Sequence, residues 1–262
     1  MSAATATRQV PAHTATALAP RRTRHCVCIP VLNEAARLPG QLARMVEIPG
    51  MPDILVADGG STDGGADPDR LRAAGVRALL VKTGPGRLGA QIRMGFAWAL
   101  DEGYQGVILI DGNGKDDPAA VPDFARALDD GWDFVQGSRF VPGGRAVNTP
   151  LLRLLGIHLV HAPLVSLAAR TRYTDTTNGF RACSRRLLED ERVAVFRDVL
   201  SGYELHYYLA IRAARLGFRV KEIPVTRAYP PRGPVPTKIS PLRGNLKVLR
   251  ALVAACLGRY DP

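Results

Sequence analysis

Residues 107–118 of this chain read Val-Ile-Leu-Ile-Asp-Gly-Asn-Gly-Lys-Asp-Asp-Pro, a short apolar run that ends in an acidic, glycine-rich turn. Four consecutive apolar residues are typical of a strand that is buried on both faces, as in a parallel sheet between helices. Asp111 would then lie at the carboxyl end of the strand, where open α/β sheets bind their ligands. This stretch therefore favours an α/β fold with a site at one edge of the sheet.

The same turn carries several oxygen donors close together. Asn113, Asp116 and Asp117 follow Asp111, and the two intervening glycines let the backbone turn tightly. Clustered oxygens suit a hard divalent cation, which usually shares its coordination shell with substrate phosphates. A solvated turn followed by a helix N-cap fits these residues equally well, so the turn alone leaves both interpretations open.

Strand patterns alternate with helix patterns over the first part of the chain, which indicates βαβ units and a parallel sheet. Beyond about residue 145 the pattern changes to two apolar helices, a loop at 171–180, a helix at 202–216 and a strand at 219–223. The expected strands are 25–31, 54–57, 76–81, 107–110 and 134–139, and the expected helices are 34–46, 67–75, 91–102 and 118–129.

The length of 262 residues suits one α/β domain, which we place at 24–240, with a C-terminal amphipathic helix and tail at 241–262. Residues 1–23 are rich in Ala, Thr and Pro and lack the apolar core of a signal peptide, so we expect a disordered arm. Residues 151–169 are strongly apolar. They contain Arg153, His158, His161 and Pro163, so we do not expect them to cross a bilayer.

The net charge of +11 points to phosphate-bearing partners, nucleic acid or an anionic membrane. No basic patch interleaved with aromatic residues is present, so we expect no nucleic-acid partner. Near the C-terminus, Leu242, Leu246, Leu249, Val253 and Cys256 fall on one helical face, beside a basic stripe of Arg243, Lys247 and Arg250. This helix could lie on an anionic membrane or pack on the domain with its basic side in solvent.

Three polar or acidic turns follow three of the expected strands, at Asn33-Glu34, Asp58 and Asp111–Asp117. Because parallel strands end at the same sheet edge, these groups would converge in one cleft. No G-x-G-x-x-G follows the first strand, and residues 84–89 (Gly-Pro-Gly-Arg-Leu-Gly) lack the closing Gly-Lys-Ser/Thr of a P-loop. A cleft lined by carboxylates instead suggests a nucleotide-diphosphate substrate held through a metal ion.

Four segments, taken in order and spacing, resemble family 2 glycosyltransferases of GT-A fold. They are 28–34 (Cys-Ile-Pro-Val-Leu-Asn-Glu), 56–64 (Val-Ala-Asp-Gly-Gly-Ser-Thr-Asp-Gly), 110–118 and 136–139 (Gln-Gly-Ser-Arg). Further motifs resemble the dolichol- or polyprenyl-phosphate mannose synthase branch, namely 175–181 (Asp-Thr-Thr-Asn-Gly-Phe-Arg), 222–224 (Glu-Ile-Pro), and Arg232 six residues before Lys238. The resemblance covers roughly residues 24–240. It implies a mostly parallel sheet flanked by helices with a C-terminal helical elaboration, and transfer of a sugar from a UDP- or GDP-sugar to a polyprenyl phosphate.

The resemblance also implies roles for particular residues. Pro30, Glu34 and Asp58 would line the nucleobase and ribose pocket, and Arg232 and Lys238 would lie near the donor diphosphate. Arg139 and Arg153 match basic positions that face the acceptor phosphate. Asp111 and Asn113 occupy the family's D-x-D positions, with Mg²⁺ or Mn²⁺ on the donor diphosphate.

The chain departs from the family pattern at this metal-binding position. Asn113 replaces the second Asp and contributes no charge, which predicts weaker metal binding unless Asp116 helps. Asp116 itself stands where the branch usually has His, and Val235 replaces a glycine between Arg232 and Lys238.

The resemblance implies an inverting transfer, and part of its mechanism can be argued from charge. A phosphate acceptor is anionic and can attack without a general base, so catalysis would depend on positioning and on stabilisation of the leaving diphosphate. A hydroxyl acceptor would need a carboxylate base, for which Asp175 is the first candidate and Glu204 the second. The residues expected to act directly are Asp111, Asp175 and Arg139.

Two alternatives to this function remain open. The same domain could glycosylate a soluble hydroxyl acceptor, or the chain could bind nucleotide sugars without catalysis if Asn113 abolishes metal binding. For the main interpretation we expect a cytoplasmic enzyme, peripheral to the inner membrane face.

Overall fold

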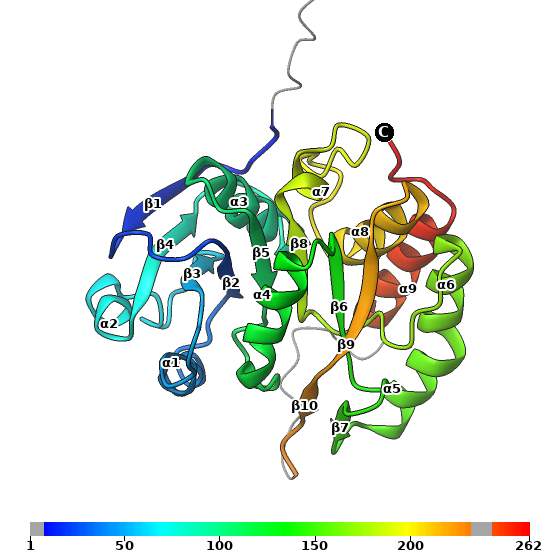
Figure 1. Cartoon of the computed structure of the whole chain (residues 1–262), viewed down its shortest axis with the longest axis horizontal. Helices are drawn as coiled ribbons and strands as arrows, with labels where there is room; N and C mark the ends of the chain where they lie inside the picture. The colour runs from blue at the N-terminus through cyan, green and yellow to red at the C-terminus, as the bar shows by residue number, and fades with distance from the viewer. Residues whose placement is uncertain (1–7, 232–242) are drawn as a thin grey trace, which may run out of the picture.

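An eight-stranded sheet forms the centre of the protein in the computed structural model, which describes residues 8–231 and 243–262. The strand order is β1-β4-β3-β2-β5-β8-β6-β9, and the sheet extends from β1 on the left of Figure 1 to β9 on the right. Its strands are β1 (His13–Ala17), β2 (Cys26–Val31), β3 (Asp53–Asp58), β4 (Val76–Lys82), β5 (Gly106–Leu109), β6 (Phe134–Ser138), β8 (Arg181–Ser184) and β9 (Val220–Pro224).

Helices cover both faces of this sheet, so the central strands are buried on both sides. Along β2, Val27 and Ile29 contribute to one apolar core, while Cys26 and Cys28 contribute to the other, as the alternation of side chains along a strand requires. The first core is closed by α1 (Leu38–Val46), α2 (Pro68–Ala73) and α4 (Val121–Asp129). The second is closed by α3 (Leu88–Asp101), α6 (Ala162–Ala169), α7 (Arg185–Glu189), α8 (Glu204–Arg215) and α9 (Arg243–Cys256).

The expected mostly parallel sheet flanked by helices is confirmed, with two antiparallel strands that the sequence pattern did not reveal. β8 inserts between β5 and β6 and runs antiparallel to both. β1 lies in residues 1–23, which we expected to be a disordered arm; instead it extends the sheet edge by pairing with β4. Residues 1–7 lie outside the described part of the chain.

The expected helix at 34–46 begins later, at Leu38, because the preceding residues form a turn that is bonded to the loop after β3. The expected helix at 118–129 comprises a short 3-10 turn, η1 (Pro118–Ala120), followed by α4. A second, two-stranded sheet pairs β7 (Arg145–Val147) in parallel with β10 (Thr226–Ala228). This small sheet carries the chain from β9 back toward the acidic turn.

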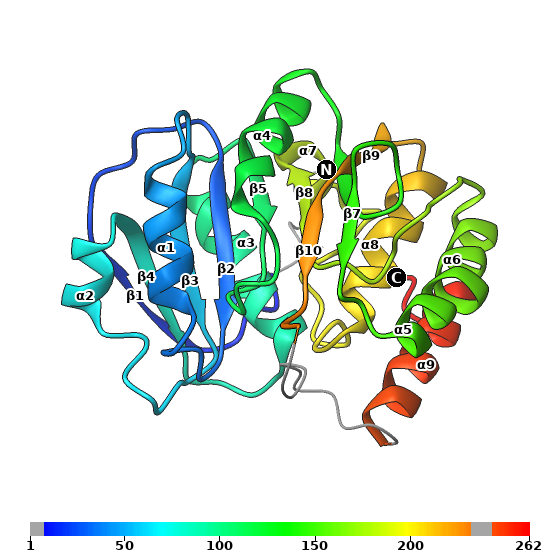
Figure 2. The same cartoon turned by 90° about the horizontal axis from the view of Figure 1, so that it is seen from below.

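Residues 151–169 form one continuous helical segment, built from α5 (Leu151–Gly156), a π-helical stretch η2 (Ile157–His161) and α6. Among the described residues, this segment is long and apolar enough to cross a membrane, with a mean hydropathy of 1.6, and 22% of its most apolar window is buried. Figure 2 shows α5, α6 and α9 together at the β9 end of the molecule. The expectation that this segment does not cross a bilayer stays a prediction.

Candidate active site

The candidate site lies at the edge of the sheet where β2, β3, β5 and β6 all end. These strands run in the same direction, since β2 pairs in parallel with β3 and β5, and β8 is antiparallel to both β5 and β6. The turns at Asn33-Glu34, Asp58 and Asp111 therefore share one edge, as predicted. Because β8 is antiparallel, the segment 175–179 that precedes it reaches the same edge.

The loops after β2 and β3 are bonded to each other across this edge. The Ser61 hydroxyl accepts from the Asn33 N–H, and the Asn33 side chain accepts from the Thr62 N–H, each at 2.8 Å. Asn33 has a φ of 52°, in the left-handed region that Asn tolerates better than most residues. These hydrogen bonds fix the two loops against each other beside Pro30.

Two of the expected nucleoside-binding residues, Asp58 and Glu34, accept hydrogen bonds within these two loops. Asp58 is buried and accepts hydrogen bonds from the backbone N–H groups of Gly60 and Ser61 and from the Ser61 hydroxyl. Glu34 accepts from the Arg37 guanidinium at 3.1 Å, and its side chain is largely shielded. Both carboxylates are thus held in fixed orientations at the strand ends.

The acidic turn that carries Asp111 is held against these loops by close backbone packing. A Cβ at Gly112 would lie 2.5 Å from a Val31 methyl, and a Cβ at Gly179 would lie 2.7 Å from the Asp111 carboxylate. A side chain at Gly112 or Gly179 would therefore force Val31 or Asp111 to move. The Gly114 N–H donates to the Gln41 side chain on α1 at 3.0 Å, which fixes the far side of the turn.

Asp111 is partly open to solvent, unlike the buried Asp116. Its side chain is 25% exposed, and its Oδ2 accepts from the Asn113 amide at 3.2 Å and from Arg227 at 3.1 Å. Within the described residues no donor reaches its Oδ1. From the described part of the chain, the Asn113 Oδ1 accepts only the Lys115 N–H, at 3.2 Å. Two oxygens from the expected D-x-D positions therefore remain available to a further ligand.

Arg227 joins Asp111 to Asp116. The strand β10 pairs with the acidic turn, where the Asp117 N–H donates to Thr226 and the Ala228 N–H donates to Lys115. This pairing brings the Arg227 guanidinium onto both carboxylates, with Asp116 completely buried. The second oxygen of Asp116 is buried with no hydrogen-bond partner among the described residues.

These charges shift the pKa values of the two carboxyl groups in opposite directions. Burial raises the pKa of Asp111, but the nearby Arg227 and Lys115 charges outweigh it and hold that pKa below its usual value. Burial raises the pKa of Asp116, and the neighbouring Asp111 charge adds to this rise against the opposing effect of Arg227. Asp111 is therefore the carboxylate that remains ionised most readily.

Cationic groups lie directly beside the acidic turn. The Arg153 guanidinium on α5 donates to the Tyr229 hydroxyl at 2.9 Å, and the Lys115 ammonium lies 5.2 Å from the Tyr229 ring centroid. Burial lowers the pKa of Lys115 to about 8, and the Arg227 charge acts in the same direction. A cavity of about 480 Å³ opens here and is lined by Arg37, Gly40, Gln41, Arg44, Asn113, Gly114, Lys115, Ala228, Tyr229 and Pro230.

Arg139 and Asp175 form a buried, bidentate ion pair. The Arg139 Nε and Nη2 donate to the two oxygens of Asp175 at 2.6 and 2.9 Å, and the side chains are 1% and 0% exposed. Asp175 also accepts from the Thr177 N–H. Burial raises the pKa of Asp175, but the bonds from Arg139 outweigh it and keep that pKa below its usual value. Glu222 secures the same loop by accepting from the N–H groups of Thr174 and Asp175.

Sequence reasoning missed four residues of this site: Lys115, His206, Arg227 and Tyr229. His206 lies near Asp111 and Arg181, and burial lowers its pKa to about 3, with Arg181 adding to the effect. No sequence pattern indicated Arg227, because its role depends on how β10 pairs with the acidic turn. Arg232 and Lys238, expected near the donor diphosphate, lie outside the described residues. In the part of the chain that is described, no three His, Cys, Asp or Glu side chains form a metal-binding group by themselves.

This chain is similar to known proteins over most of its length. The family model of Glycosyl transferase family 2 matches residues 26–192. An undecaprenyl-phosphate mannosyltransferase of Micrococcus luteus is 35% identical over 203 residues, covering 76% of this chain and 81% of the relative. A polyprenol monophosphomannose synthase of Mycolicibacterium smegmatis is 33% identical over 220 residues, covering 78% of this chain and 77% of the relative.

Solved structures show the same fold. Glucosyl-3-phosphoglycerate synthase of Mycobacterium tuberculosis, in complex with Mn²⁺, uridine-diphosphate-glucose and phosphoglyceric acid, has a TM-score of 0.62 and 22% identity, covering 91% of this chain and 80% of that chain. The expected GT-A fold is confirmed. With the family match and the two relatives, it identifies the protein as a glycosyltransferase enzyme that belongs to glycosyltransferase family 2.

Proposed function

We propose that this enzyme transfers a sugar, with inversion, from a nucleotide-diphosphate donor to a polyprenyl phosphate. The proposal rests on one observation: the partly exposed Asp111 carboxylate lies close to three cationic side chains, those of Lys115, Arg153 and Arg227. Acidic oxygens suit a metal-bound diphosphate, and the cations suit a second, free phosphate. The names of the two mannosyl-transferring relatives support the same acceptor class.

The oxygen donors of the acidic turn fit a divalent cation such as Mg²⁺ or Mn²⁺. Asp111 Oδ1 and Asn113 Oδ1 would hold it, and the unpartnered second oxygen of Asp116 makes that residue a further candidate. All three are hard oxygen ligands, which these cations prefer. When bound, the cation would neutralise the charge of the leaving diphosphate. The Mn²⁺ in the related synthase is consistent with this choice.

The donor nucleoside would lie against the loops after β2 and β3, beside Pro30, Glu34 and Asp58. Those loops are fixed by their mutual hydrogen bonds, so little ordering would be required on binding. Arg232 and Lys238 remain proposed contacts of the donor diphosphate.

The buried ion pair of Arg139 and Asp175 favours a phosphate acceptor over a hydroxyl acceptor. Both oxygens of Asp175 are bonded to Arg139, and its pKa is low, so it is a poor proton acceptor in this arrangement. A phosphate is already ionised and requires no base. We therefore assign its binding to Arg153 and Lys115, and propose that Arg139 and Asp175 act on the reaction by holding the 175–179 loop against Asp111.

A polyprenyl chain is confined to a bilayer, so the proposed acceptor implies that the enzyme works at a membrane surface. We propose that it is peripheral to the cytoplasmic face of the inner membrane. The basic, carboxylate-free composition of residues 243–260 supports contact with anionic lipid.

The proposed function is tested by incubating the protein with a panel of UDP- and GDP-sugars, Mn²⁺ and polyprenyl phosphate, while measuring release of nucleoside diphosphate. We expect release that depends on the lipid phosphate, and loss of that release in Asp111→Asn. Transfer to water-soluble hydroxyl acceptors alone would contradict the proposal. Donor binding without any turnover would instead support a nucleotide-sugar-binding protein.

A further inference from the structure

A row of leucines faces solvent along the continuous helical segment 151–169. Leu152, Leu159 and Leu167 are 84%, 70% and 78% exposed. We define the leucine face as Leu151, Leu152, Leu155, Leu159 and Leu167, all of which are exposed. Most of these residues recur every four positions, or a multiple of four, which aligns them along one side of a helix. Soluble proteins rarely leave so many large apolar side chains together in water.

The neighbouring helix α9 exposes a second apolar row. Leu246, Leu249, Val253 and Leu257 are all exposed, whereas Leu252 and Ala255 pack into the core. The sequence pattern grouped Leu246, Leu249, Val253 and Cys256 on one face; the structure exposes the first three, whereas Cys256 is half-buried and packs against the core. Leu242 lies outside the described residues. Helices α6 and α9 contact each other, so the two rows belong to the same end of the molecule (Figure 2).

The segments that carry the two rows contain basic but no acidic side chains, and Asp261, which follows the second segment, is paired with Arg212. Residues 151–172 and 243–260 contain no Asp or Glu. Lys247 and Arg250 are exposed and make no ion pair with any described residue. An apolar surface bordered by unpaired cations is the combination that binds an anionic bilayer.

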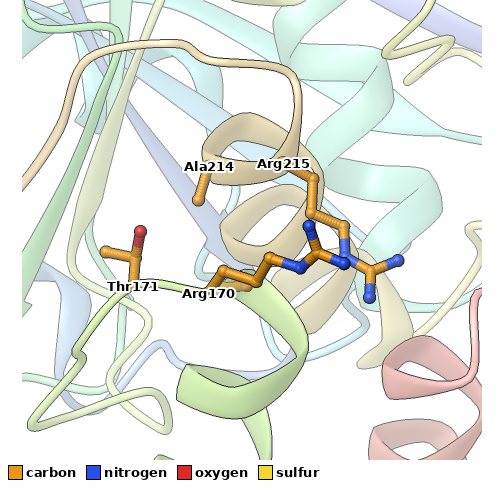
Figure 3. Close-up of a pocket in the computed structure, with 5 residues that line it drawn as sticks. Arg170, Thr171, Ala214 and Arg215 are labelled. Carbon is orange, nitrogen blue, oxygen red and sulfur yellow. The ribbon is translucent and has the colours of Figure 1, made fainter.

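A cavity at the C-terminal end of α6 adds a candidate site for an anionic headgroup. It has a volume of about 330 Å³ and is lined by Arg170, Arg215 and three smaller residues (Figure 3). Arg215 donates to the Ala168 carbonyl at 2.6 Å, and the Arg170 side chain makes no hydrogen bond or ion pair with described residues. Two cations on one cavity without a carboxylate favour an anion between them.

The leucine face is also continuous with the candidate active site. Arg153 lies on α5 between exposed leucines, and its guanidinium reaches inward to Tyr229. A lipid whose chain lies against the leucine face could therefore present its phosphate to Arg153 without leaving the bilayer.

We propose that the leucine face and the exposed row on α9 form a docking surface for an anionic membrane, with both helices lying in the plane of the interface. The inner side of 151–169 supports this orientation over a spanning one, because Ile157, Val165 and Ala169 are buried in the protein. Crossing the bilayer would pull these residues away from their core. A second copy of this chain fits less well, because the unpaired cations of two such surfaces would repel each other.

The inference deepens the proposed function and rests on it for the identity of the lipid acceptor. It is tested with the full chain by flotation on phosphatidylcholine vesicles, with and without phosphatidylglycerol. We expect binding that requires phosphatidylglycerol, and a loss on the order of tenfold for each of Leu152→Glu and Leu159→Glu. Val46→Glu, which alters an exposed valine on α1, should bind like the unaltered protein. Lys247→Gln with Arg250→Gln should reduce the dependence on phosphatidylglycerol.

Orientation is tested by attaching a polarity-sensitive fluorophore at Leu152→Cys and at Leu167→Cys. Both labels should report the same shallow depth and the same leaflet. Depths at the bilayer centre or in opposite leaflets would overturn in-plane docking in favour of a spanning helix. Concentration-dependent dimers in the absence of lipid that Leu152→Glu abolishes would overturn it in favour of self-association.

Failure of docking can be separated from failure of the proposed function. If the proposed function holds, Lys247→Gln with Arg250→Gln keeps full transfer to a short-chain polyprenyl phosphate dissolved in detergent, since no bilayer is involved. Vesicle binding that is unaffected by every leucine variant, together with normal transfer in detergent, would overturn the docking surface alone.

Discussion

Arg227 and Asp116 form a buried ion pair, and the same guanidinium also contacts the partly exposed carboxylate of Asp111. This relationship explains how two carboxylates can be close together in a buried turn: one cation compensates both. It also ties the geometry of the acidic turn to strand β10, which delivers Arg227.

We predict that Asp116→Asn destabilises the protein strongly, because it leaves much of a buried arginine charge uncompensated. The expected loss is about 3 kcal/mol in the free energy of unfolding, measured by denaturant titration. Asp123→Asn, which removes an exposed carboxylate paired with Arg126, should cost less than about 1 kcal/mol. Replacing both charges, with Asp116→Leu and Arg227→Met, should recover much of the loss. Equal effects of the buried and exposed substitutions would contradict the compensating role of Arg227.

The position of Asn113 predicts that Asn113→Asp strengthens metal binding. A second carboxylate beside Asp111 adds charge to the same pair of oxygens, so affinity for Mn²⁺ should rise on the order of tenfold. Titration calorimetry with Mn²⁺ in the presence of a nucleoside diphosphate measures this directly. The matched control is Asp117→Asn, which alters an exposed acid on the outer side of the turn and should leave affinity unchanged. Unchanged affinity in Asn113→Asp would exclude this side chain as a ligand.

Asp116→Ala separates the two possible metal arrangements. If the unpartnered oxygen of Asp116 contributes to the site, affinity for Mn²⁺ falls in this variant, as measured by the same titration. If affinity is retained in a folded Asp116→Ala protein, the metal is held by Asp111, Asn113 and the donor phosphates, and the acidic charge of Asp116 serves only Arg227.

The lowered pKa of Lys115 predicts that acceptor binding depends on pH. Burial and the Arg227 charge lower its pKa to about 8, so the ammonium that would bind a phosphate is present below that pH and is lost above it. Acceptor affinity should therefore be steady from about pH 7, where the acceptor phosphate is already doubly ionised, to about pH 8, and fall about tenfold for each further pH unit. Lys115→Arg should abolish this decline, because a guanidinium stays protonated. A decline that persists in Lys115→Arg would assign the titration to another group.

The pair of Arg139 and Asp175 predicts a stability that depends on pH on the acid side. The folded-state pKa of Asp175 lies below its unfolded value, because the bonds from Arg139 outweigh the effect of burial. Its stabilising contribution is therefore complete above the unfolded pKa and is lost as the pH falls through the folded pKa. Asp175→Asn should cost about 3–5 kcal/mol at neutral pH, with a smaller difference in acid. Asp69→Asn, at an exposed pair with Arg72, should show no such difference.

The parts of the fold that the sequence predicted are those fixed by local pattern. Val107–Ile110 is apolar throughout and is buried on both faces, and the acidic turns follow the strands as their spacing indicated. Strands β1 and β8 were missed because neither has a pattern of its own. β8 is only four residues long, and β1 exists because the exposed edge of β4 accepts it.

The site was predictable only where motifs follow the strands. Asp58 and Asp111 lie at strand ends, so the topology alone brings them to one edge. Arg227 depends instead on the pairing of β10 with residues 115–117, which joins segments far apart in the chain. The ion pair between Arg139 and Asp175 was likewise not predicted, because the sequence motifs assigned each of these residues a separate role.

Transfer to two acceptors that differ only in the phosphate tests the central claim most directly. Labelled sugar from the preferred donor is followed into the lipid phase with polyprenyl phosphate and with the corresponding neutral polyprenol, for the unaltered protein and for Arg153→Gln. We expect transfer to the phosphate alone, weakened in the variant through a higher KM for the lipid. Transfer to polyprenol at a comparable rate would show that no acceptor phosphate is required, and would contradict the proposed function.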